Sequence, residues 1–581
     1  MTVRIHSALS AIALLSLCGG CTALLHLDDT QCHTNADCEA RGPAFQGMVC
    51  LATSCVQPSV VSSGDGGLPS PSNSSGGMDA GTGGSDTGAP DSADAGGCVS
   101  NTQCVADNLG EPYACLKKGD PCVALKTEEC PIVMGNYNDD NALYVGAFLN
   151  LPAASPLSQM SALNVQLAVN EINGSVGGLP GGPLGKLRPL ATVACRNDPT
   201  LLDAAAAHLM NDVHAPGVIA NLASADLKNF FVNYALPNSA FVINPGFADN
   251  TLTSLTTAGL LWHVIGDIRD VAPAYRPLVT RTETYLRAGG ATGDLKVAML
   301  VTNRYAEQSI ADTVTPLLQW NGKSVTDNGS NFFTTSVPSL TDTPNADYST
   351  INSSIVSFQP DIIISIAREE LVYKIMPVVE ASWPAGARRP MYILPNAVSG
   401  NLDLLKYLGI DDTNDSSETK RTRQVGVAPA SALDTTMYDQ FMIRFRTANP
   451  QFQNAGGFEN FYDSAYLLAY AMYGAGSVPA LTGPDIARGM QKTVTGSTVV
   501  DIGPTHLADG FAALAAGGSI SMNGTMGPSS DFDPGVGARR GNGSVYCVNR
   551  ASGALSFLYD VLRYDTTNAV LHGTFPCFTG F

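Results

Sequence analysis

Two apolar runs indicate the fold class of this chain: Ile362-Ile-Ile-Ser-Ile366 and the similar Val297-Ala-Met-Leu-Val301. Each run is short and apolar on both faces of an extended strand. Strands that are buried on both faces are typical of a parallel sheet with helices packed on either side. The two runs therefore predict an α/β fold.

Around these runs, short apolar segments alternate with helical patterns from about residue 139 to the end of the chain. Leu143 to Leu151 is expected to form a strand and Gln159 to Ile172 a helix, and this alternation is the pattern of a parallel α/β sheet. Further strands are expected at 187–193, 217–222, 240–244, 296–301, 362–366 and 391–394, and further helices at 201–213, 225–234, 271–287, 309–320, 348–358 and 465–473. The last of these helices is uncharged and too short to span a bilayer, which indicates burial.

Composition narrows the possible partners. The chain has 581 residues, of which 44% are hydrophobic and only 14% charged, with a net charge of −19. A strongly acidic protein repels phosphate backbones, so nucleic acid is not expected as a partner. The length predicts more than one domain.

The N-terminus resembles a bacterial lipoprotein signal. Arg4 precedes a short apolar run, and Cys18-Gly-Gly-Cys21 follows it. We expect residues 1–20 to be removed and Cys21 to carry the lipid, although Leu17 lies one position earlier than the lipobox pattern requires. Ordinary signal-peptide cleavage without lipidation is the alternative.

Twelve further cysteines indicate an oxidising compartment. Cys32, Cys38, Cys50 and Cys55 are spaced almost as Cys98, Cys104, Cys115 and Cys122 are, which predicts two disulfide-rich repeats at 21–56 and 98–138. Each repeat allows three pairings. The remaining four cysteines are expected to pair as Cys130 with Cys195 and Cys547 with Cys577. Zinc is the alternative ligand, but neither repeat has the two-residue cysteine spacing common in zinc sites.

Residues 57–97, between the two repeats, contain no aromatic and no basic residue. Such a Gly/Ser/Pro/Asp-rich segment has no means of building a core and predicts a linker of roughly 35 Å in root-mean-square length. Residues 139–581 are then the ligand-binding domain.

No catalytic motif, metal site or cofactor motif is found in the sequence. Gly322-Lys323-Ser324 lacks the earlier glycine of a phosphate loop and indicates a turn at the end of a helix. His208, His263, His506 and His572 are expected to be surface or satisfied core histidines. We therefore expect a binding protein, not an enzyme, with no cofactor.

Several segments occur in the order seen in the leucine/isoleucine/valine-type periplasmic binding proteins. They include Tyr144-Val-Gly-Ala-Phe-Leu-Asn150, Ala168-Val-Asn-Glu-Ile-Asn173, Val218-Ile-Ala-Asn-Leu-Ala-Ser224 and Phe461-Tyr-Asp-Ser-Ala-Tyr-Leu-Leu468. The resemblance covers about residues 140–581. It implies the two-lobed type I periplasmic-binding-protein fold, with lobe 1 built from about 140–266 and 426–515, and lobe 2 from about 267–425 and 516–581.

The resemblance also implies a ligand site between the lobes. Ser224 matches the serine that holds a ligand carboxylate, and Gly246 matches a backbone contact to the same group. Tyr305 matches a cleft tyrosine. For each, a plain structural role is the alternative: a helix cap for Ser224, and a solvent-facing position for Tyr305.

Three positions depart from the family's amino-acid signature. Ala248 replaces a threonine, Arg368 stands where the family has a cleft tyrosine, and Asn396 stands where an acid binds the ligand ammonium. Asp249, Glu369 or Glu370 are candidates for the missing negative charge.

The expected function is that of a lipid-anchored solute-binding protein in the bacterial cell envelope. It is expected to capture an amino acid or related small carboxylate and to deliver it to the membrane permease of an ABC-type importer. A sensory or surface-interaction lipoprotein with the same fold is the alternative, and an exported hydrolase has no motif to support it.

Overall fold

The computed structural model describes residues 49–51, 54–56, 97–151, 159–180, 186–412, 416–430, 432, 435–452, 458–476, 480–551 and 554–581. The expected signal peptide, Cys21 and the linker up to residue 96 lie outside these ranges. The chain divides into two compact units, Met1–Asp91 and Ser92–Phe581. In the first unit, the described part is an antiparallel hairpin of β1 (Val49–Leu51) and β2 (Ser54–Val56).

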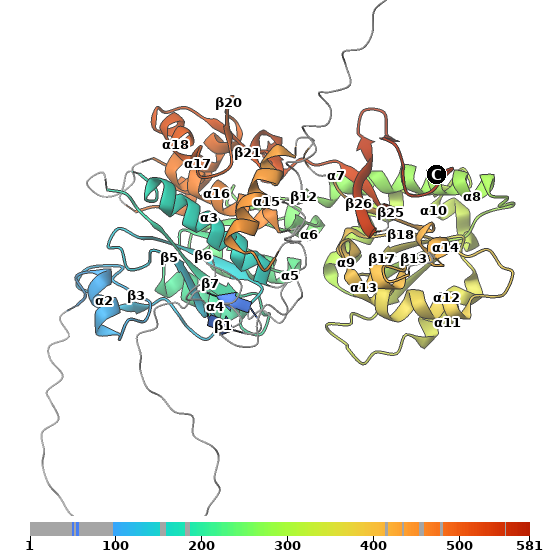
Figure 1. Cartoon of the computed structure of the whole chain (residues 1–581), viewed down its shortest axis with the longest axis horizontal. Helices are drawn as coiled ribbons and strands as arrows, with labels where there is room; N and C mark the ends of the chain where they lie inside the picture. Colours follow the sequence, from blue (N-terminus) through green and yellow to red (C-terminus); the bar gives the residue numbers. More distant parts are fainter. Residues whose placement is uncertain are drawn as a thin grey trace, which may run out of the picture. The chain divides into compact units, whose positions relative to one another are not determined.

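The second unit contains two eight-stranded sheets, and each sheet is the centre of one lobe (Figure 1). The sheet of lobe 1 has the order β23-β24-β11-β9-β8-β6-β7-β5, and its central strands are parallel. Its strands are β5 (Ile132–Gly135), β6 (Leu143–Leu149), β7 (Leu190–Arg196), β8 (Gly217–Ala220), β9 (Phe241–Asn244), β11 (Leu261–His263), β23 (Phe532–Asp533) and β24 (Ala538–Arg539). The predicted α/β fold is confirmed in this lobe.

Helices cover both faces of the lobe 1 sheet. One face packs against α3 (Met160–Val176), α15 (Thr436–Ala448), α16 (Glu459–Gly474), α17 (Gly483–Val494) and α18 (Leu507–Ala515). The other face packs against α4 (Leu202–Ala207) and α5 (Ser224–Phe230), which continue as π-helical turns at His208–Asp212 and Phe231–Ala235. A small sheet of β20 (Thr498–Asp501), β21 (Ile520–Gly524) and β22 (Gly527–Pro528) lies beside α17 and α18.

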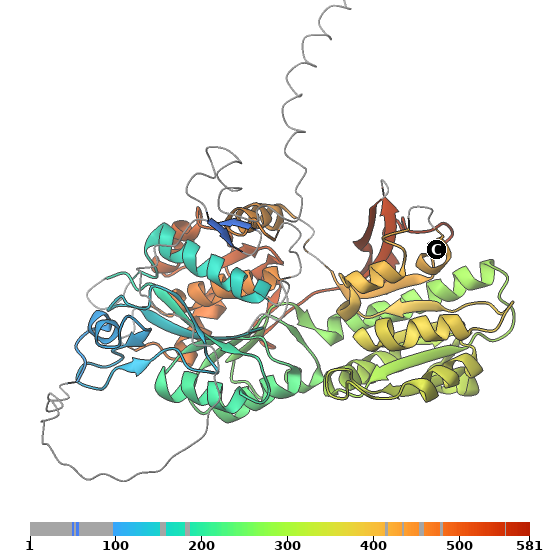
Figure 2. The ribbon, with the colours of Figure 1, turned by 60° about the horizontal axis from the view of Figure 1, so that its bottom comes forward.

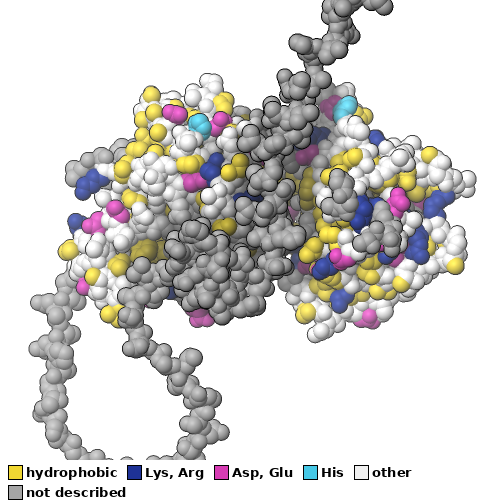
Figure 3. Space-filling view, viewed as in Figure 1, with side chains coloured by type: hydrophobic (Ala, Val, Ile, Leu, Met, Phe, Trp, Pro, Cys, Tyr) yellow, Lys and Arg dark blue, Asp and Glu magenta, His cyan; other side chains and the backbone are white. Residues whose placement is uncertain are grey.

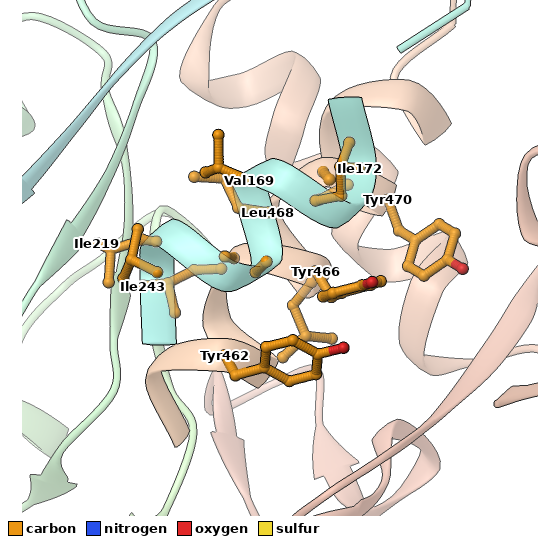
Figure 4. Packing of buried hydrophobic residues seen from close by; sticks show 14 of the residues in the cluster. Val169, Ile172, Ile219, Ile243, Tyr462, Tyr466, Leu468 and Tyr470 are labelled. Atoms are coloured by element: carbon orange, nitrogen blue, oxygen red, sulfur yellow. The ribbon is translucent and has the colours of Figure 1, made fainter. Parts of the chain in front are cut away.

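Helix α16 is buried almost along its whole length, and the uncharged stretch 465–473, for which burial is predicted, lies within it. Figure 4 shows its tyrosines and Leu468 beside Val169 and Ile172 of α3, with Ile219 and Ile243 of the sheet close by. The hydroxyls of Tyr462 and Tyr466 both donate to the carboxylate of Glu171. These two buried hydroxyls are thus hydrogen-bonded, as most buried polar groups are, whereas the Tyr470 hydroxyl has no hydrogen-bond partner among the described residues.

The sheet of lobe 2 has the order β16-β13-β17-β18-β19-β25-β26-β27. The parallel strands are β13 (Val297–Thr302), β16 (Phe332–Val337), β17 (Ile362–Ile366), β18 (Met391–Leu394) and β19 (Gln424–Pro429), and the antiparallel ones are β25 (Gly543–Ala551), β26 (Ala554–Asp565) and β27 (Val570–His572). Strands β13 and β17 are buried at every position. The two runs that predict the fold are therefore central strands of one sheet.

The strands of lobe 2 lie between two layers of helices (Figure 2). Helices α8 (Tyr275–Ala288) and α9 (Tyr305–Val314) pack on one face, and α11 (Ser349–Phe358), α12 (Met376–Ser382) and α13 (Leu402–Tyr407) on the other. Short helices α10 (Val325–Asn328) and α14 (Glu418–Arg421) lie in connections. No helix among the described residues combines the length and hydropathy needed to cross a membrane.

The chain crosses between the lobes three times. The first crossing follows β10 (Phe247–Ala248) and β12 (Gly266–Asp267), which pair with each other, and leads into α7 (Ile268–Val271). The second follows β19, so residues 426–429 belong to lobe 2 and not to lobe 1 as expected. The third follows β24, so residues 516–539 belong to lobe 1 and not to lobe 2. Strands β22 to β24 have two residues each and are too short to carry a pattern from which this boundary is predictable.

Two local expectations are wrong in lobe 2. The helix expected at 309–320 begins earlier, at Tyr305, and ends at Val314. Gly322-Lys323-Ser324 does not end a helix but belongs to a hairpin of β14 (Gln319–Trp320) and β15 (Lys323–Ser324). Asn321 and Gly322 both have positive φ, 55° and 67°, as the two central residues of a tight hairpin turn require.

The second Cys-rich repeat is folded onto lobe 1. Its helix α2 (Asn101–Asp107) and hairpin β3 (Tyr113–Ala114)–β4 (Val123–Ala124) are joined by disulfides Cys98–Cys115 and Cys104–Cys122. These Sγ atoms lie close together because the disulfides are neighbours, so the cluster is not a zinc site. Leu125 is fully buried in the same core as α4, and the predicted segment 98–138 ends inside the sheet, because 132–135 form β5.

The two remaining disulfide predictions are confirmed. Cys130 is bonded to Cys195, which ties the chain just before β5 to β7, and Cys547 of β25 is bonded to Cys577. Each disulfide joins segments within one lobe. Neither one restrains the two lobes against each other.

Candidate functional site

The candidate residues follow the carboxyl ends of parallel strands in both lobes. Ser224 follows β8, Gly246 follows β9, Tyr305 follows β13, Arg368 follows β17 and Asn396 follows β18. In open parallel sheets this edge is the usual place for ligands, because loops and helix N-termini meet there. The strand order thus brings the candidates of each lobe to one sheet edge.

An amide network that the sequence did not indicate lies at the lobe 1 edge. Asn150 Oδ1, after β6, accepts hydrogen bonds from Asn197 Nδ2 and Asn221 Nδ2, the latter at 3.3 Å. All three side chains are half-buried. Single asparagines in three separate loops carry no sequence signal, because only the parallel sheet brings these loops together.

Ser224 is the first residue of α5 and not its cap. The capping position is Ala223, which has no side-chain cap bond. Ser224 is half-buried, so the alternative of a plain cap is not what the structure shows.

Gly246 already has a partner for its backbone N–H. That group donates to Asn244 Oδ1 at 2.8 Å, and Asn244 Nδ2 donates to His263 Nδ1 at 2.9 Å. A ligand carboxylate at Gly246 would have to compete with Asn244. Burial lowers the pKa of His263 to about 4, so this imidazole is a neutral acceptor.

Ala248 and Asp249 lie at the first crossing and are buried. Asp249 caps α6 (Asn250–Thr253), because its Oδ1 accepts from the backbone N–H of Thr251 at 2.8 Å. Its Oδ2 has no hydrogen-bond partner among the described residues. Ala248 is a strand residue of β10, and its methyl side chain offers no hydrogen bond.

Arg368 lies among carboxylates at the lobe 2 edge. Its Nη1 is 3.8 Å from Glu307 Oε1, and its Nε is 3.6 Å from Glu369 Oε2. Both distances exceed hydrogen-bonding range, and 43% of the Arg368 side chain is exposed. Arg304 also lies 3.7 Å from Glu369. The guanidinium of Arg368 is thus attracted by charge but not locked by hydrogen bonds.

Glu307 is a second residue that the sequence did not indicate. It lies in the first turn of α9, and its Oε2 has no hydrogen-bond partner within the described ranges. Burial raises the pKa of Glu307, while Arg368 lowers it. The helix predicted to begin at residue 309 had placed Glu307 in a loop.

Glu370 and Asn396 have structural partners. Glu370 is fully buried and accepts from Leu340 N at 2.8 Å, Arg368 N at 3.1 Å and Thr302 Oγ1 at 3.3 Å. Asn396 is exposed and accepts from Ser399 Oγ at 3.2 Å. Glu370 is therefore a poor candidate for a ligand ammonium.

A pocket of about 250 Å³ lies where the lobes meet. Its lining comes from α5, α6 and the residue after α6 in lobe 1 and from α9 in lobe 2, and each lining residue carries a polar group: Lys228, Asn250, Thr251, Ser254, Tyr305, Gln308, Ser309 and Asp312. Tyr305 is therefore at the junction of the lobes, with 61% of its surface exposed. The other candidates do not line this pocket.

A wider hollow of about 730 Å³ lies at the opposite edge of lobe 2, beside Lys296 and Phe358. It is at the amino ends of the strands and is far more open. On the face shown in Figure 3, basic and acidic side chains are interspersed over lobe 2, with no large basic patch. The pocket between the lobes is thus the better candidate site.

Comparisons with known proteins bear on the fold. No family model and no curated protein matches the sequence. A fatty acid ABC transporter substrate-binding protein from Thermomonospora curvata is similar in structure, with 13% identity, a TM-score of 0.50, and coverage of 74% of this chain and 94% of its own. A leucine binding protein, LivK, from Thermotoga maritima has 13% identity, a TM-score of 0.49, and coverage of 72% and 98%. A solute binding protein from Rhodopseudomonas palustris, in complex with 3,4-dihydroxy benzoic acid, has 12% identity, a TM-score of 0.48, and coverage of 75% and 98%. The likeness to the Thermomonospora curvata protein, together with the two sheets and their helices, shows the two-lobed type I periplasmic-binding-protein fold, which confirms the fold that the sequence resemblance implied.

Proposed function

We propose that this chain is a solute-binding protein that captures a small molecule between its lobes. The observation that carries the proposal is the polar pocket at the lobe junction, which both lobes line and which Tyr305 borders. Its position beside the carboxyl ends of parallel strands is where this kind of sheet binds ligands. Closure of two lobes around a ligand would give a shape that a partner protein can recognise.

The proposed ligand is an amino acid or a related small carboxylate. Arg368 supports an anionic group, because its Nε has no hydrogen-bond partner among the described residues and the side chain is partly exposed. A planar guanidinium binds a carboxylate in a bidentate way. Ser224, at the carboxyl edge of the lobe 1 sheet, is the proposed contact for a second carboxylate, although neither Ser224 nor Arg368 is among the residues that line the pocket.

An ammonium group on the ligand contributes little to binding in this proposal. Asn396 has no charge, and Glu370 is used within lobe 2. An unpaired buried cation costs several kcal/mol. Dicarboxylates and acylated amino acids are therefore proposed to bind better than leucine. Asp249, Glu307 and Glu369 are the carboxylates that would serve an ammonium if one is bound.

The proposal places the protein outside the cytoplasm, anchored by a lipid on Cys21, with an importer permease as its partner. Four disulfides in the described ranges support an oxidising compartment. The role is binding, without turnover of the ligand and without a cofactor.

The decisive experiment is mass spectrometry of the full-length protein purified from its own host, first intact under native conditions and then after denaturation. We expect a stoichiometric small carboxylate that is released on unfolding. Calorimetry with L-leucine, L-glutamate and N-acetyl-L-glutamate then ranks the ligand classes. A protein that carries no small molecule and binds none of these compounds would contradict the proposed function, and so would turnover of any of them.

A further inference from the structure

We infer that Asn250 is a clasp between the lobes that sets their resting separation beside the pocket. Asn250 is the first residue of α6 in lobe 1, and both of its hydrogen bonds across the junction end on α9 of lobe 2. Its backbone N–H donates to Ser309 Oγ at 3.1 Å, and its Nδ2 donates to Thr313 Oγ1 at 2.6 Å. One residue thus bonds two hydroxyls of the other lobe.

The two hydroxyls that accept these hydrogen bonds lie side by side on α9. Ser309 and Thr313 are four residues apart in a helix, so they lie one above the other on the same face. Thr313 Oγ1 donates its own proton to Ser309 O at 2.9 Å. With its proton used in this way, the Thr313 hydroxyl can only accept from Asn250, which makes the contact directional.

Both ends of the clasp lie in helices whose neighbouring residues are buried. Asn250 is held by the cap that Asp249 places on α6, and Asp249 is 2% exposed. Ser309 is 8% exposed and lies in the middle of α9. A change in the angle between the lobes therefore has to break or stretch these two hydrogen bonds, because Asn250 moves with lobe 1 whereas Ser309 and Thr313 move with lobe 2.

The clasp borders the proposed ligand site. Asn250 and Ser309 line the pocket, and Tyr305 begins the same helix that Asn250 holds. Asn250 is therefore a positioning residue: it acts on the ligand through the placement of α9 and Tyr305. Its effect on lobe separation depends on the two-lobed fold alone, whereas its effect on a ligand rests on the proposed function.

The test measures the distance between lobes in the ligand-free, full-length protein. Spin labels are attached through a ketone-bearing non-natural amino acid at Val232 in lobe 1 and Val378 in lobe 2, which are 41% and 44% exposed. This chemistry leaves the disulfides intact. Double electron–electron resonance then gives the distribution of lobe separations.

The variants separate the effect of the hydrogen bonds between the lobes from any effect on the stability of a helix. Thr313→Val removes the acceptor but keeps the shape, and Thr313→Ser restores a hydroxyl. Thr284→Val on α8 is the matched control, because Thr284 Oγ1 makes the same kind of bond to the carbonyl four residues earlier, at 2.9 Å, but Thr284 is exposed on α8. Asn250→Ala removes the donor side chain.

In Thr313→Val and Asn250→Ala, we expect the population with the wild-type lobe separation to fall roughly fivefold relative to all other separations. This is the change expected for the loss of one net hydrogen bond. Thr313→Ser and Thr284→Val should keep the wild-type distribution. If Thr313→Val, folded by circular dichroism, keeps the wild-type distribution as well, the clasp is refuted. The measurement uses no ligand, so a failure of the proposed function leaves its outcome unchanged.

Discussion

Removing the Cys130–Cys195 disulfide should destabilise lobe 1 and leave lobe 2 unchanged. The perturbation is the double variant Cys130→Ala/Cys195→Ala. The two cysteines are 65 residues apart, and a cross-link of that span lowers the entropy of the unfolded chain by an amount worth about 4 kcal/mol. Both residues are fully buried, so alanine avoids placing a new polar group in the core.

The three tryptophans of the chain report on separate lobes. Trp262 lies in β11 of lobe 1, whereas Trp320 and Trp383 lie in lobe 2, and all three are buried. Urea unfolding is followed by Trp262 fluorescence in a Trp320→Phe/Trp383→Phe background, and by the other two in a Trp262→Phe background. We expect the Trp262 transition to lose about 4 kcal/mol and the lobe 2 transition to stay in place.

The matched control is Cys547→Ala/Cys577→Ala, whose cysteines are 30 residues apart in lobe 2. It should cost about 3.6 kcal/mol and move only the lobe 2 signals. A loss below about 1 kcal/mol for the first variant would refute the loop-entropy reasoning. Equal shifts of both signals in either variant would show that the lobes unfold as one unit.

Three further predictions concern the anchor, the ligand and pH. Cys21→Ala should move the protein from the membrane fraction to the soluble fraction on cell fractionation, and retention in the membrane would contradict the lipid anchor. Arg368→Ala should weaken binding of N-acetyl-L-glutamate at least tenfold in calorimetry, whereas tight leucine binding that ignores this substitution would restore an ordinary branched-chain ligand. Because the folded-state pKa of His263 is about 4, below its ordinary value of 6.5, only the unfolded state gains this proton between those values. The free energy of unfolding should therefore fall by up to about 1.4 kcal/mol per pH unit from pH 6.5 to pH 4, and His263→Asn should remove that part of the slope in urea titrations.

Much of the fold is predictable from local patterns. The strands at 297–301, 362–366 and 391–394 are found where the apolar runs predict them, because a strand covered on both faces has to be apolar throughout. The pairings Cys130–Cys195 and Cys547–Cys577 agree with the prediction from the sequence. The candidate residues at the carboxyl ends of the strands could be selected from the sequence, because each one follows a strand that its apolar run identifies.

Other features depended on contacts between distant segments. The assignment of 516–539 to lobe 1 rests on the pairing of β21 with β20 and on a single register pair between β24 and β11, which no local pattern reports. Glu307 was missed because α9 begins at Tyr305, before its first run of apolar residues.

The site itself belongs to the tertiary structure. The sequence could place Tyr305 after a strand, but Asn250 and Thr313 are 63 positions apart and have no shared pattern. They meet because the packing of the two lobes brings α6 against α9 near the first crossing. Periodicity determines which face of a strand or helix is buried, since burial repeats with the local geometry of the backbone. Which polar groups face each other across the lobes depends on the crossings, and only the three-dimensional path of the chain decides that.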